Sequence, residues 1–553
     1  MKKCFSVIVM LVMSVVLLLP LAACNREMVN PNDKIDETKT QLRISNYQGG
    51  FGRVWLDNAA ARFEEKYKNE SFEPGKTGVE IHITSSINDT AGPTFLSGLP
   101  NNPNHIIFTE NVSYDAVLAG NYAADITDIV KEQKLTEFGE DVTIEDKLDT
   151  SLSKYFATTA GKYYALPHYE AYCGIVYDKD LFDIKGFWIS ASGEYTKNKS
   201  NLSKGPDNRA GTYDDGLPAT FDEFFALCEY MTQKGVTPFT WAGGVPVVAT
   251  HALVNLWADY EGKENYYLNY SHSGTATTLV NSMDGTGKPN ASGTYDDMMP
   301  ATPINESNAD LLKRQAGRYV ALDFMQRLVS NGNFYTDLSF SPSETNLTAQ
   351  GTYLLSRLES TKKPIAFLFD GVWWENEADE SGKFEEYSVY GETRQTRKFG
   401  WLPFPKATTT QLNDADNRRT ISTNCNNSLS FINGNIKDEN VLKCAKKFYQ
   451  FIHTDNELQE FSVVTGTLKP MKYSIPLEKQ NKMSAFGKEI LALRANEYVD
   501  IVYTYARTDD FVNHPENYYP ETIAWNTSLG YNPAVIFKAG NTTIKDIYDL
   551  LTA

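Results

Sequence analysis

Apolar and polar positions follow two regular patterns in the first part of the chain. Residues 42–44 and 79–83 carry an apolar side chain at every second position, and residues 106–108 are wholly apolar. Between the first two runs, residues 56–67 repeat apolar side chains at intervals of three and four. These patterns predict strands in those three places and a helix over 56–67. Because strands that alternate with helices are typical of β-α-β units, we predict an α/β fold with a largely parallel sheet.

A second block with the same patterns follows a predicted crossing segment at 163–167, where Pro167 restricts the backbone. Here the spacing predicts strands near 174–177, 239–241 and 364–369, and helices near 221–232, 441–452 and 458–464. Thr220 and Glu223 have the spacing of a capping box before the first of these helices. Gly466 follows the last one, at a position where glycine commonly ends a helix.

The N-terminus has the layout of a secretory signal. Lys2 and Lys3 precede a nearly unbroken apolar run, and Leu-Ala-Ala then leads to Cys24. This arrangement resembles a bacterial lipoprotein box, which implies a signal peptide over 1–23 and a lipid on Cys24. Residues 24–40 then form a flexible tether to the membrane. The alternative is an uncleaved signal anchor in which the cysteine is incidental.

Composition excludes several classes of protein. The 553 residues include 52 Lys and Arg against 70 Asp and Glu, a formal charge of −18. An acidic balance argues against a broad nucleic-acid surface and against a polybasic membrane-binding face. Hydrophobic residues make up 41%, so the chain is globular, and its length predicts more than one domain. Plentiful aromatic residues in polar surroundings suggest a surface that contacts a flat, apolar partner.

Sequence signatures of catalysis are missing. The chain has no His-Glu-x-x-His, no Gly-x-Ser-x-Gly, no Gly-x-x-x-x-Gly-Lys and no Cys-x-x-Cys. Its seven histidines are scattered, without a pair at metal-ligand spacing. Cys173, Cys228, Cys425 and Cys444 are too few for a disulfide framework in a body of this size. We therefore expect neither an enzyme nor a bound cofactor.

Polar and aromatic side chains instead gather where the predicted strands end. In open α/β sheets, ligands bind beyond the carboxyl ends of the strands. The candidate ligand-binding residues at these ends and at the crossing are Tyr47, Gln48, Glu110, Asn111, Tyr169, Glu170, Trp241, Asp370, Trp373, Trp374 and Glu375.

This set of side chains suits a sugar. Aromatic rings stack on the C–H face of a sugar, and carboxylate and amide oxygens accept its hydroxyl protons. The set contains no Arg or Lys, which argues against a phosphate or carboxylate ligand. Each residue also has an ordinary alternative: Tyr47 and Trp241 as core aromatics, and Asp370 as a helix cap. Trp373 and Trp374 point about 100° apart on a helix, so one of them is expected in the core.

A repeated phrase marks two polar insertions, near 185–219 and 262–306. Residues 211–220 and 293–302 agree at eight of ten positions. The paired carboxylates Asp214 with Asp215, and Asp296 with Asp297, are candidates for a hard cation such as calcium. Neither copy has EF-hand spacing, so a reused turn before the next element is the interpretation we favour.

Several segments, in this order, resemble extracellular solute-binding proteins of the maltose-binding type. They are the lipoprotein box, residues 45–50, 61–67, 161–167, 174–182, 369–374, 398–406 and 448–461. The resemblance covers about 41–184 and 360–475, whereas the two polar insertions and the tail after about 475 depart from it.

The resemblance implies a two-lobe, periplasmic-binding-protein-like α/β fold with hinge crossings and a helical C-terminal region. The first lobe would comprise 41–166 plus about 424–466, and the second about 169–420 plus 470–553. It further implies a monomeric subunit of a carbohydrate ABC importer on the outer face of a bacterial membrane. That subunit would capture a saccharide between its lobes, with Trp373 stacking on it, and deliver it to a permease.

Three alternatives remain open at the level of sequence. A polyamine or other cationic ligand also suits carboxylates and an aromatic cage, and the acidic charge agrees with it. An anchored glycoside hydrolase would use two of the carboxylates, such as Glu110 and Glu170, as its acid and base. A surface adhesin would bind glycans without a permease, and permease genes beside this one would argue against it.

Overall fold

The computed structural model describes residues 35–86, 92–110, 112–281, 298–358, 362–414, 416–423, 428–504 and 532–552. The predicted signal peptide, Cys24 and most of the tether lie outside these ranges, as do Asn111, Asp296, Asp297 and Cys425. Within them, no helix combines the length and the apolar composition that a membrane crossing requires.

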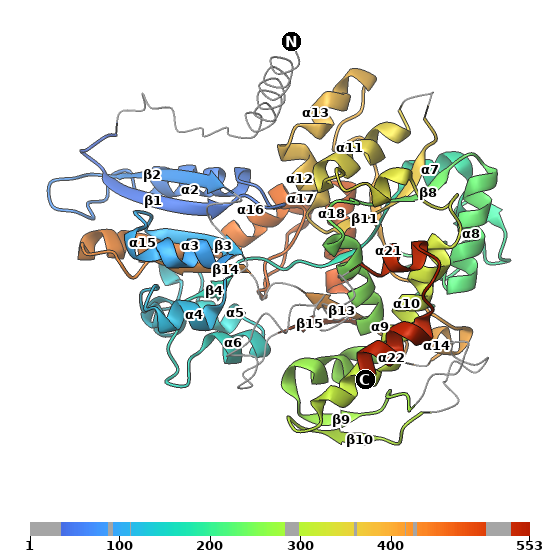
Figure 1. The fold of residues 1–553 in the computed structure, drawn as a ribbon. Coiled ribbons are helices and arrows are strands. Elements are labelled where there is room, and N and C mark those ends of the chain that lie inside the picture. The colour runs from blue at the N-terminus through green and yellow to red at the C-terminus, as the bar shows by residue number, and fades with distance from the viewer. Residues whose placement is uncertain are drawn as a thin grey trace, which may run out of the picture.

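A five-stranded sheet forms the centre of the first lobe (Figure 1). Its order is β2 (Val79–Ser86), β1 (Thr40–Tyr47), β3 (Ile106–Glu110), β14 (Ser428–Ile432) and β4 (Leu166–Pro167). The first three strands are parallel, as predicted, and β14 is antiparallel to both of its neighbours. The sheet is therefore completed by a strand from far along the sequence, which ties the return of the chain to its beginning.

Helices with apolar faces cover this sheet. The predicted helix near 56–67 is α2 (Val54–Lys66), which packs on β2, and α15 (Glu439–Phe451) packs on β1. Helix α16 (Asp455–Thr465) packs on α2 and ends at Gly466, whose φ of 76° is the left-handed conformation that favours glycine. The remaining helices of this lobe are α3 (Gly92–Gly98), α4 (Tyr114–Ala119), α5 (Ile144–Lys147) and α6 (Thr150–Phe156).

A four-stranded sheet forms the centre of the second lobe. Its order is β12 (Phe399–Leu402), β5 (Cys173–Asp178), β11 (Ile365–Gly371) and β8 (Thr237–Thr240). Only β11 and β8 are parallel, and β5 is antiparallel to both of its neighbours. The prediction of a largely parallel sheet is wrong for this lobe, because β5 arrives directly from the other lobe and runs against the strands beside it.

The helices of the second lobe begin where the sequence places a cap. Asp178 accepts a hydrogen bond from the Leu181 amide at the start of α7 (Lys179–Lys185). Thr220 caps α8 (Phe221–Gln233), although the Glu223 carboxylate accepts from Ala219 rather than closing the predicted capping box. The other principal elements here are α9 (Val247–Ser271), α10 (Ala316–Val329), α11 (Asn346–Ser356), α12 (Trp374–Glu380), α13 (Lys383–Tyr387) and α14 (Thr409–Leu412), with short ladders β6–β7 (Trp188–Ile189, Tyr195–Thr196) and β9–β10 (Gly274–Ala276, Thr302–Ile304).

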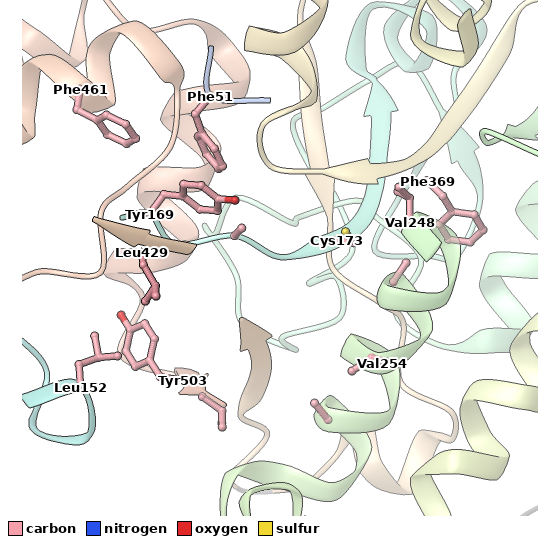
Figure 2. Close-up of a cluster of buried hydrophobic side chains, with 14 of the residues drawn as sticks. Phe51, Leu152, Tyr169, Cys173, Val248, Val254, Phe369, Leu429, Phe461 and Tyr503 are labelled. Carbon is pink, nitrogen blue, oxygen red and sulfur yellow. The ribbon is translucent and has the colours of Figure 1, made fainter. Parts of the chain in front are cut away.

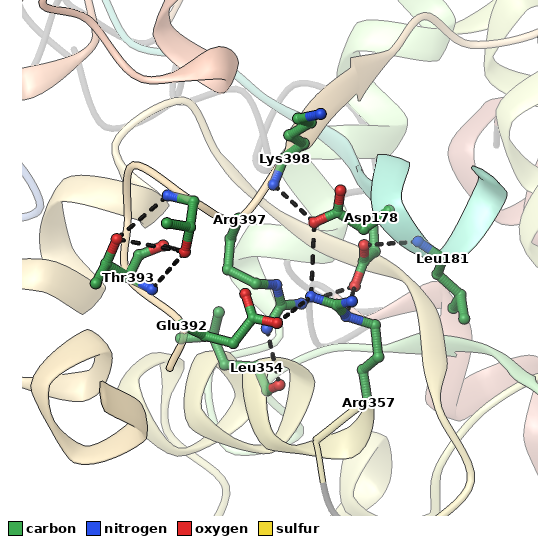
Figure 3. A network of polar contacts seen from close by, with 10 residues as sticks. Asp178, Leu181, Leu354, Arg357, Glu392, Thr393, Arg397 and Lys398 are labelled. Atoms are coloured by element: carbon green, nitrogen blue, oxygen red, sulfur yellow. Dashed lines mark hydrogen bonds and ion pairs between the residues drawn. The ribbon is translucent and has the colours of Figure 1, made fainter. Parts of the chain in front are cut away.

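A buried ion-pair network fixes one edge of the second sheet (Figure 3). The Arg397 guanidinium donates to the Asp178 carboxylate over 2.7 Å, and Arg357 lies 3.3 Å from the same carboxylate. Burial raises the pKa of Asp178, and the two arginines oppose that shift. The network joins the start of α7 to the chain that leads into β12, so the charge of a fully buried carboxylate is compensated.

Two described stretches of chain run between the lobes. Residues 168–172 join β4 to β5, and residues 466–470 follow α16, while β13 (Arg419–Thr423) precedes β14 in the sequence. These two stretches lie side by side, since the Glu170 amide donates to the Leu468 carbonyl over 3.1 Å. The first stretch is also held by α9, because the Asn255 side chain donates to the Cys173 carbonyl over 2.8 Å.

The C-terminal part of the chain packs mainly on the second lobe. Helix α17 (Leu477–Gln480) leads to α18 (Ala485–Ala495), which lies on β12, and β15 (Val499–Tyr503) pairs in parallel with β13. Helix α21 (Pro533–Lys538) and helix α22 (Ile544–Thr552) pack against α10. The residue boundaries proposed for the two lobes from the sequence stay a prediction.

One cluster of buried side chains spans both lobes (Figure 2). It includes Phe51 and Phe461 of the first lobe, Tyr169 and Cys173 of the crossing, and Phe369 of the second lobe. The apolar core is thus continuous through the crossing. Cys173, Cys228 and Cys444 are buried, and Cys228 and Cys444 form no disulfide with another described residue.

Candidate ligand-binding site

The loop after β1 meets the start of α12 at the interface of the two lobes. The indole of Trp373 lies between two glycines: a Cβ atom on Gly50 would stand 2.0 Å from the ring, and one on Gly371 would stand 2.3 Å from it. The ring centroid of Phe51 is 6.1 Å from that of Trp373 and 4.0 Å from that of Tyr169. Trp373 remains partly exposed, so part of its surface is open to a ligand.

Polar contacts hold the lobes together beside these rings. The Glu380 carboxylate accepts hydrogen bonds from the amides of Arg53 (2.8 Å) and Val54 (3.3 Å), at the first turn of α2. Helix α2 has no side-chain cap of its own, so Glu380 supplies one from the opposite lobe. We call this contact the Glu380 cap. The Asn376 side chain also donates to the Gly50 carbonyl over 3.2 Å.

Three carboxyl groups lie next to this contact and form what we call the carboxyl cluster: Glu110 at the end of β3, Asp370 at the end of β11, and Glu377 on α12. Tyr47, at the end of β1, hydrogen-bonds to Glu110. The Gln350 amide donates to Asp370 over 3.0 Å and to Glu377 over 2.7 Å. The cluster therefore receives residues from both lobes.

Burial is the main cause of unusual proton affinities in the carboxyl cluster. It raises the pKa of Glu110 to about 8, with the hydrogen bond from Tyr47 opposing the shift and the charge of Glu377 adding to it. Burial and the charge of Glu377 also raise the pKa of Asp370 to about 8. The pKa of Glu377 itself is raised by burial. The charge of Glu377, in the second lobe, acts on Glu110, in the first lobe, so the two carboxyl groups lie near each other across the interface.

Other buried carboxylates near the interface are neutralised by arginine. Glu170 lies 3.1 Å from Arg494 and accepts from the Tyr503 hydroxyl, and Glu375 lies 3.2 Å from Arg394. Within the part of the chain that the structure describes, no basic side chain forms a salt bridge with the carboxyl cluster. The cluster is thus chemically distinct from its surroundings.

Several predicted site residues do not reach this interface. Trp374 is fully buried in the second lobe, where its ring lies 4.8 Å from that of Phe399, so one of the paired tryptophans is core, as expected. Trp241 is 1% exposed, against Phe340 and Phe369. Each of these two indoles is enclosed by aromatic side chains of its own lobe, and their assignment as ligand contacts stays a prediction.

The carboxylates of Glu170 and Glu375 are likewise engaged in their ion pairs, which the sequence did not reveal because Arg394 and Arg494 lie far along the chain. Gln48 is exposed beside the interface, and Asn111 lies outside the described residues. Tyr169 is buried, with its ring on Phe51. Of the predicted set, the structure brings together Tyr47, Glu110, Asp370 and Trp373.

Phe51, Gln350 and Glu377 were missed by the sequence analysis. Glu377 follows Trp373 by four residues, which places both on one side of α12, so helical spacing was a usable signal. Gln350 comes from α11 and carries no local signal, since only the tertiary fold brings it to Asp370.

The repeated phrase forms a turn in its first copy. Asp214 accepts from the Asp207 amide and the Thr212 hydroxyl, and Asp215 accepts from the Gly211 amide over 2.7 Å. These bonds lie within one loop, in agreement with the turn interpretation. No group of His, Cys, Asp and Glu side chains within the described ranges is arranged to hold a metal ion.

A separate cavity of about 360 Å³ lies between α6, α9 and β15. Its walls include Tyr155, Tyr267 and Tyr503. Figure 2 shows Tyr503 on the opposite side of the crossing from Phe51 and Tyr169. The cavity and the carboxyl cluster are therefore two different places at the junction of the lobes.

Comparison with known proteins identifies the fold. No family model and no curated protein matches the chain. Among solved structures, it is similar to BlMnBP1, an ABC-transporter binding protein from Bifidobacterium animalis subsp. lactis in complex with mannobiose, with a TM-score of 0.52, 16% identity, and coverage of 94% of this chain and 96% of that one. The fold is that of the two-lobe solute-binding proteins.

Two further structures agree. RafE in complex with raffinose has a TM-score of 0.51 at 12% identity, with 93% of this chain and all of that one covered. A probable secreted solute-binding lipoprotein from Streptomyces coelicolor has a TM-score of 0.51 at 14% identity, with 93% and 97% covered. In the two-lobe fold, the residues around Trp373 lie where strands of both lobes end.

Proposed function

We propose that this chain is the carbohydrate-binding component of an ABC importer. It captures a saccharide between its lobes and presents it to a membrane permease, without making or breaking a bond in the ligand. The observation that carries the proposal is the meeting of strand ends from both lobes around Trp373, Tyr47 and the carboxyl cluster. Similar folds that bind mannobiose and raffinose support it.

The chemistry of these side chains suits a sugar. The indole of Trp373 offers a flat apolar surface for the C–H face of a ring, and Glu110 and Glu377 offer oxygen acceptors for its hydroxyl groups. Because the two walls belong to different lobes, a ligand that contacts both stabilises the closed arrangement over an open one. Ligand capture is thereby coupled to lobe closure.

The hydrolase alternative loses one of its two candidate carboxylates. Glu170 faces Arg494 and Tyr503, on the other side of the crossing from the ring of Tyr169. Because the Glu170 carboxylate is bound by Arg494 and Tyr503, Glu110 and Glu170 are not arranged as an acid and base around one sugar.

A binding panel tests this proposal. Mono- and oligosaccharides of differing linkage are titrated calorimetrically into the mature protein, and each ligand is recovered and analysed afterwards. The proposal predicts one-to-one binding of at least one saccharide, which is recovered intact. Absence of binding to any saccharide would refute it, and so would a hydrolysed product.

The location and the partners are part of the same proposal. Cys24 carries the lipid anchor, residues 24–40 form the tether, and the binding protein works as a monomer on the outer face of the cell membrane. A permease and its ATPase receive the ligand. The sequence of the N-terminal segment supports the anchor, and the secreted lipoprotein with a similar fold agrees with it.

A further inference from the structure

The carboxyl cluster holds more acid than a neutral sugar requires. Glu110, Asp370 and Glu377 meet at the lobe interface, and none of them is paired with a base among the described residues. Some buried carboxylates elsewhere in the molecule are paired with lysine or arginine, such as Asp178 with Arg397 and Asp259 with Lys406, whereas Asp214 lies beside Asp207 instead. Glu110 and Asp370 hold their protons near neutral pH in the ligand-free protein, and a positive group placed between them would favour their ionised forms.

A second observation comes from Gln350. Its side chain is fully buried and directed at the cluster, where its amide nitrogen donates to Asp370 and Glu377. Its carbonyl oxygen has no hydrogen-bond partner among the residues that the structure describes. An unpartnered buried acceptor is unfavourable, and a ligand with spare donors would satisfy it.

The hydrogen-bond acceptors of the cluster are complementary to an ammonium group. Carboxylate and amide oxygens are acceptors, and an ammonium group has three donors and no acceptor. The partly exposed face of Trp373 lies one helical turn from Glu377, and an indole face also attracts a cation. No group of His, Cys, Asp and Glu among the described residues is arranged to hold a metal ion.

We propose that the natural ligand is a saccharide carrying a free, protonated amino group, which the cluster of Glu110, Asp370, Glu377 and Gln350 binds. This inference rests on the proposed function and specifies its substrate class. The sugar rings contact Trp373 and Tyr47, and the ammonium group enters between the carboxylates of the two lobes. The charge of the ligand then completes the contact that closes them.

Matched ligands test the inference. Glucosamine, galactosamine and mannosamine, and β-1,4-linked glucosamine oligomers, are titrated calorimetrically beside their N-acetylated and hydroxyl counterparts, with spermidine as an amine without a sugar. The expected result is that at least one free amino sugar binds about tenfold or more tightly than both of its neutral counterparts.

Substitutions in the carboxyl cluster test whether it binds the amino group of the ligand. Glu377→Gln and Glu110→Gln, which keep the size of each side chain, are expected to reduce the preference for the amine to within about threefold. Glu385→Gln, at an exposed position of α13, is the matched control and should keep the full preference. Thermal unfolding of each ligand-free variant confirms that it is folded.

Each of the other possible results would overturn a specific part of the proposal. Neutral sugars that bind as tightly as their amino counterparts would overturn the inference and leave the proposed function intact. A preference that both variants retain would place the amine elsewhere and overturn the assignment to this cluster. Binding of spermidine with no saccharide bound would refute the proposed function as well.

Discussion

At the scale of single residues, the interface between the lobes combines an aromatic ring with carboxyl groups. Trp373 is an apolar ring held between Gly50 and Gly371, and beside it Glu110 and Glu377 form no salt bridge with any described basic residue. The ring offers an apolar surface and the carboxyl groups offer polar atoms. Substituting each group separately therefore measures its own contribution to ligand binding.

Trp373 and Trp374 are adjacent in sequence and have opposite roles in the structure. Trp373→Ala removes the partly exposed indole and should weaken saccharide binding at least about tenfold with little effect on folding. Trp374→Ala leaves a cavity in a packed core and should cost about 3–5 kcal/mol of unfolding free energy. Calorimetric titration and chemical denaturation of both variants measure the two effects. Equal losses of affinity and stability in both would contradict this separation.

The carboxyl of Glu110 links folding to pH. Its pKa is about 8 in the folded, ligand-free protein, against the ordinary value of 4.5 in the unfolded chain. The folded state therefore holds the proton more tightly, and the stabilisation it gives is complete below pH 4.5 and declines as the pH rises toward 8.

Glu110→Gln should abolish this contribution. Between pH 4.5 and 8, the stability of the wild type relative to the variant should fall by at most about 1.4 kcal/mol per pH unit. Urea denaturation at a series of pH values measures the difference, with Glu385→Gln as the control that follows the wild type. Parallel curves for wild type and Glu110→Gln would show that Glu110 has an ordinary pKa.

At the scale of elements, the first turn of α2 depends on the opposite lobe. The backbone amides of Arg53 and Val54 donate hydrogen bonds to the Glu380 carboxylate. If the lobes separate, these amides can hydrogen-bond only to water. A helix N-terminus favours a negative group, and the Glu380 cap thus stabilises the closed arrangement.

Removing the cap should shift the lobes toward an open arrangement. Glu380→Ala is expected to reduce the free energy that favours the closed arrangement by about 0.5–2 kcal/mol, which is typical of a lost N-cap. The ligand affinity should fall by the fold-change that corresponds to this loss. Small-angle scattering of the ligand-free protein should give a larger radius of gyration for Glu380→Ala than for Glu385→Ala. An unchanged radius together with unchanged affinity would mean that the cap does not contribute to closure.

Much of the element order was predictable, because strands such as β1 and β3 and helices such as α2 and α16 have strong periodicity and clear ends. The direction in which neighbouring strands pair was less predictable. β5 and β14 come directly from the other lobe and run antiparallel to their neighbours, which depends on the path of the chain rather than on local pattern.

Residues of the candidate site were predictable from the sequence only where they lie at the end of a predicted strand. Tyr47, Glu110 and Asp370 end strands, so their place at the interface followed from the rule for open sheets. Which tryptophan faces outward depended on the packing around α12, and the partners of Glu170 and Glu375 come from distant parts of the chain. The Gln350 contact with Asp370 could not be predicted for the same reason.

At the scale of the whole molecule, the proposed lipid anchor on Cys24 can be tested directly. Cys24→Ser should prevent lipid attachment and move the protein from the membrane fraction to the soluble extracellular or periplasmic fraction. Fractionation and metabolic labelling with a radioactive fatty acid measure this, with Cys228→Ser as a control cysteine. A Cys24→Ser protein that remains in the membrane fraction would favour the uncleaved signal anchor.

The most direct test of the central proposal is a crystal structure of the mature protein with its tightest-binding saccharide. The account predicts a sugar in contact with both lobes, against Trp373 and Glu377 on one side and Tyr47 and Glu110 on the other. A saccharide bound instead in the cavity beside Tyr155 and Tyr267, or held by one lobe alone, would contradict it.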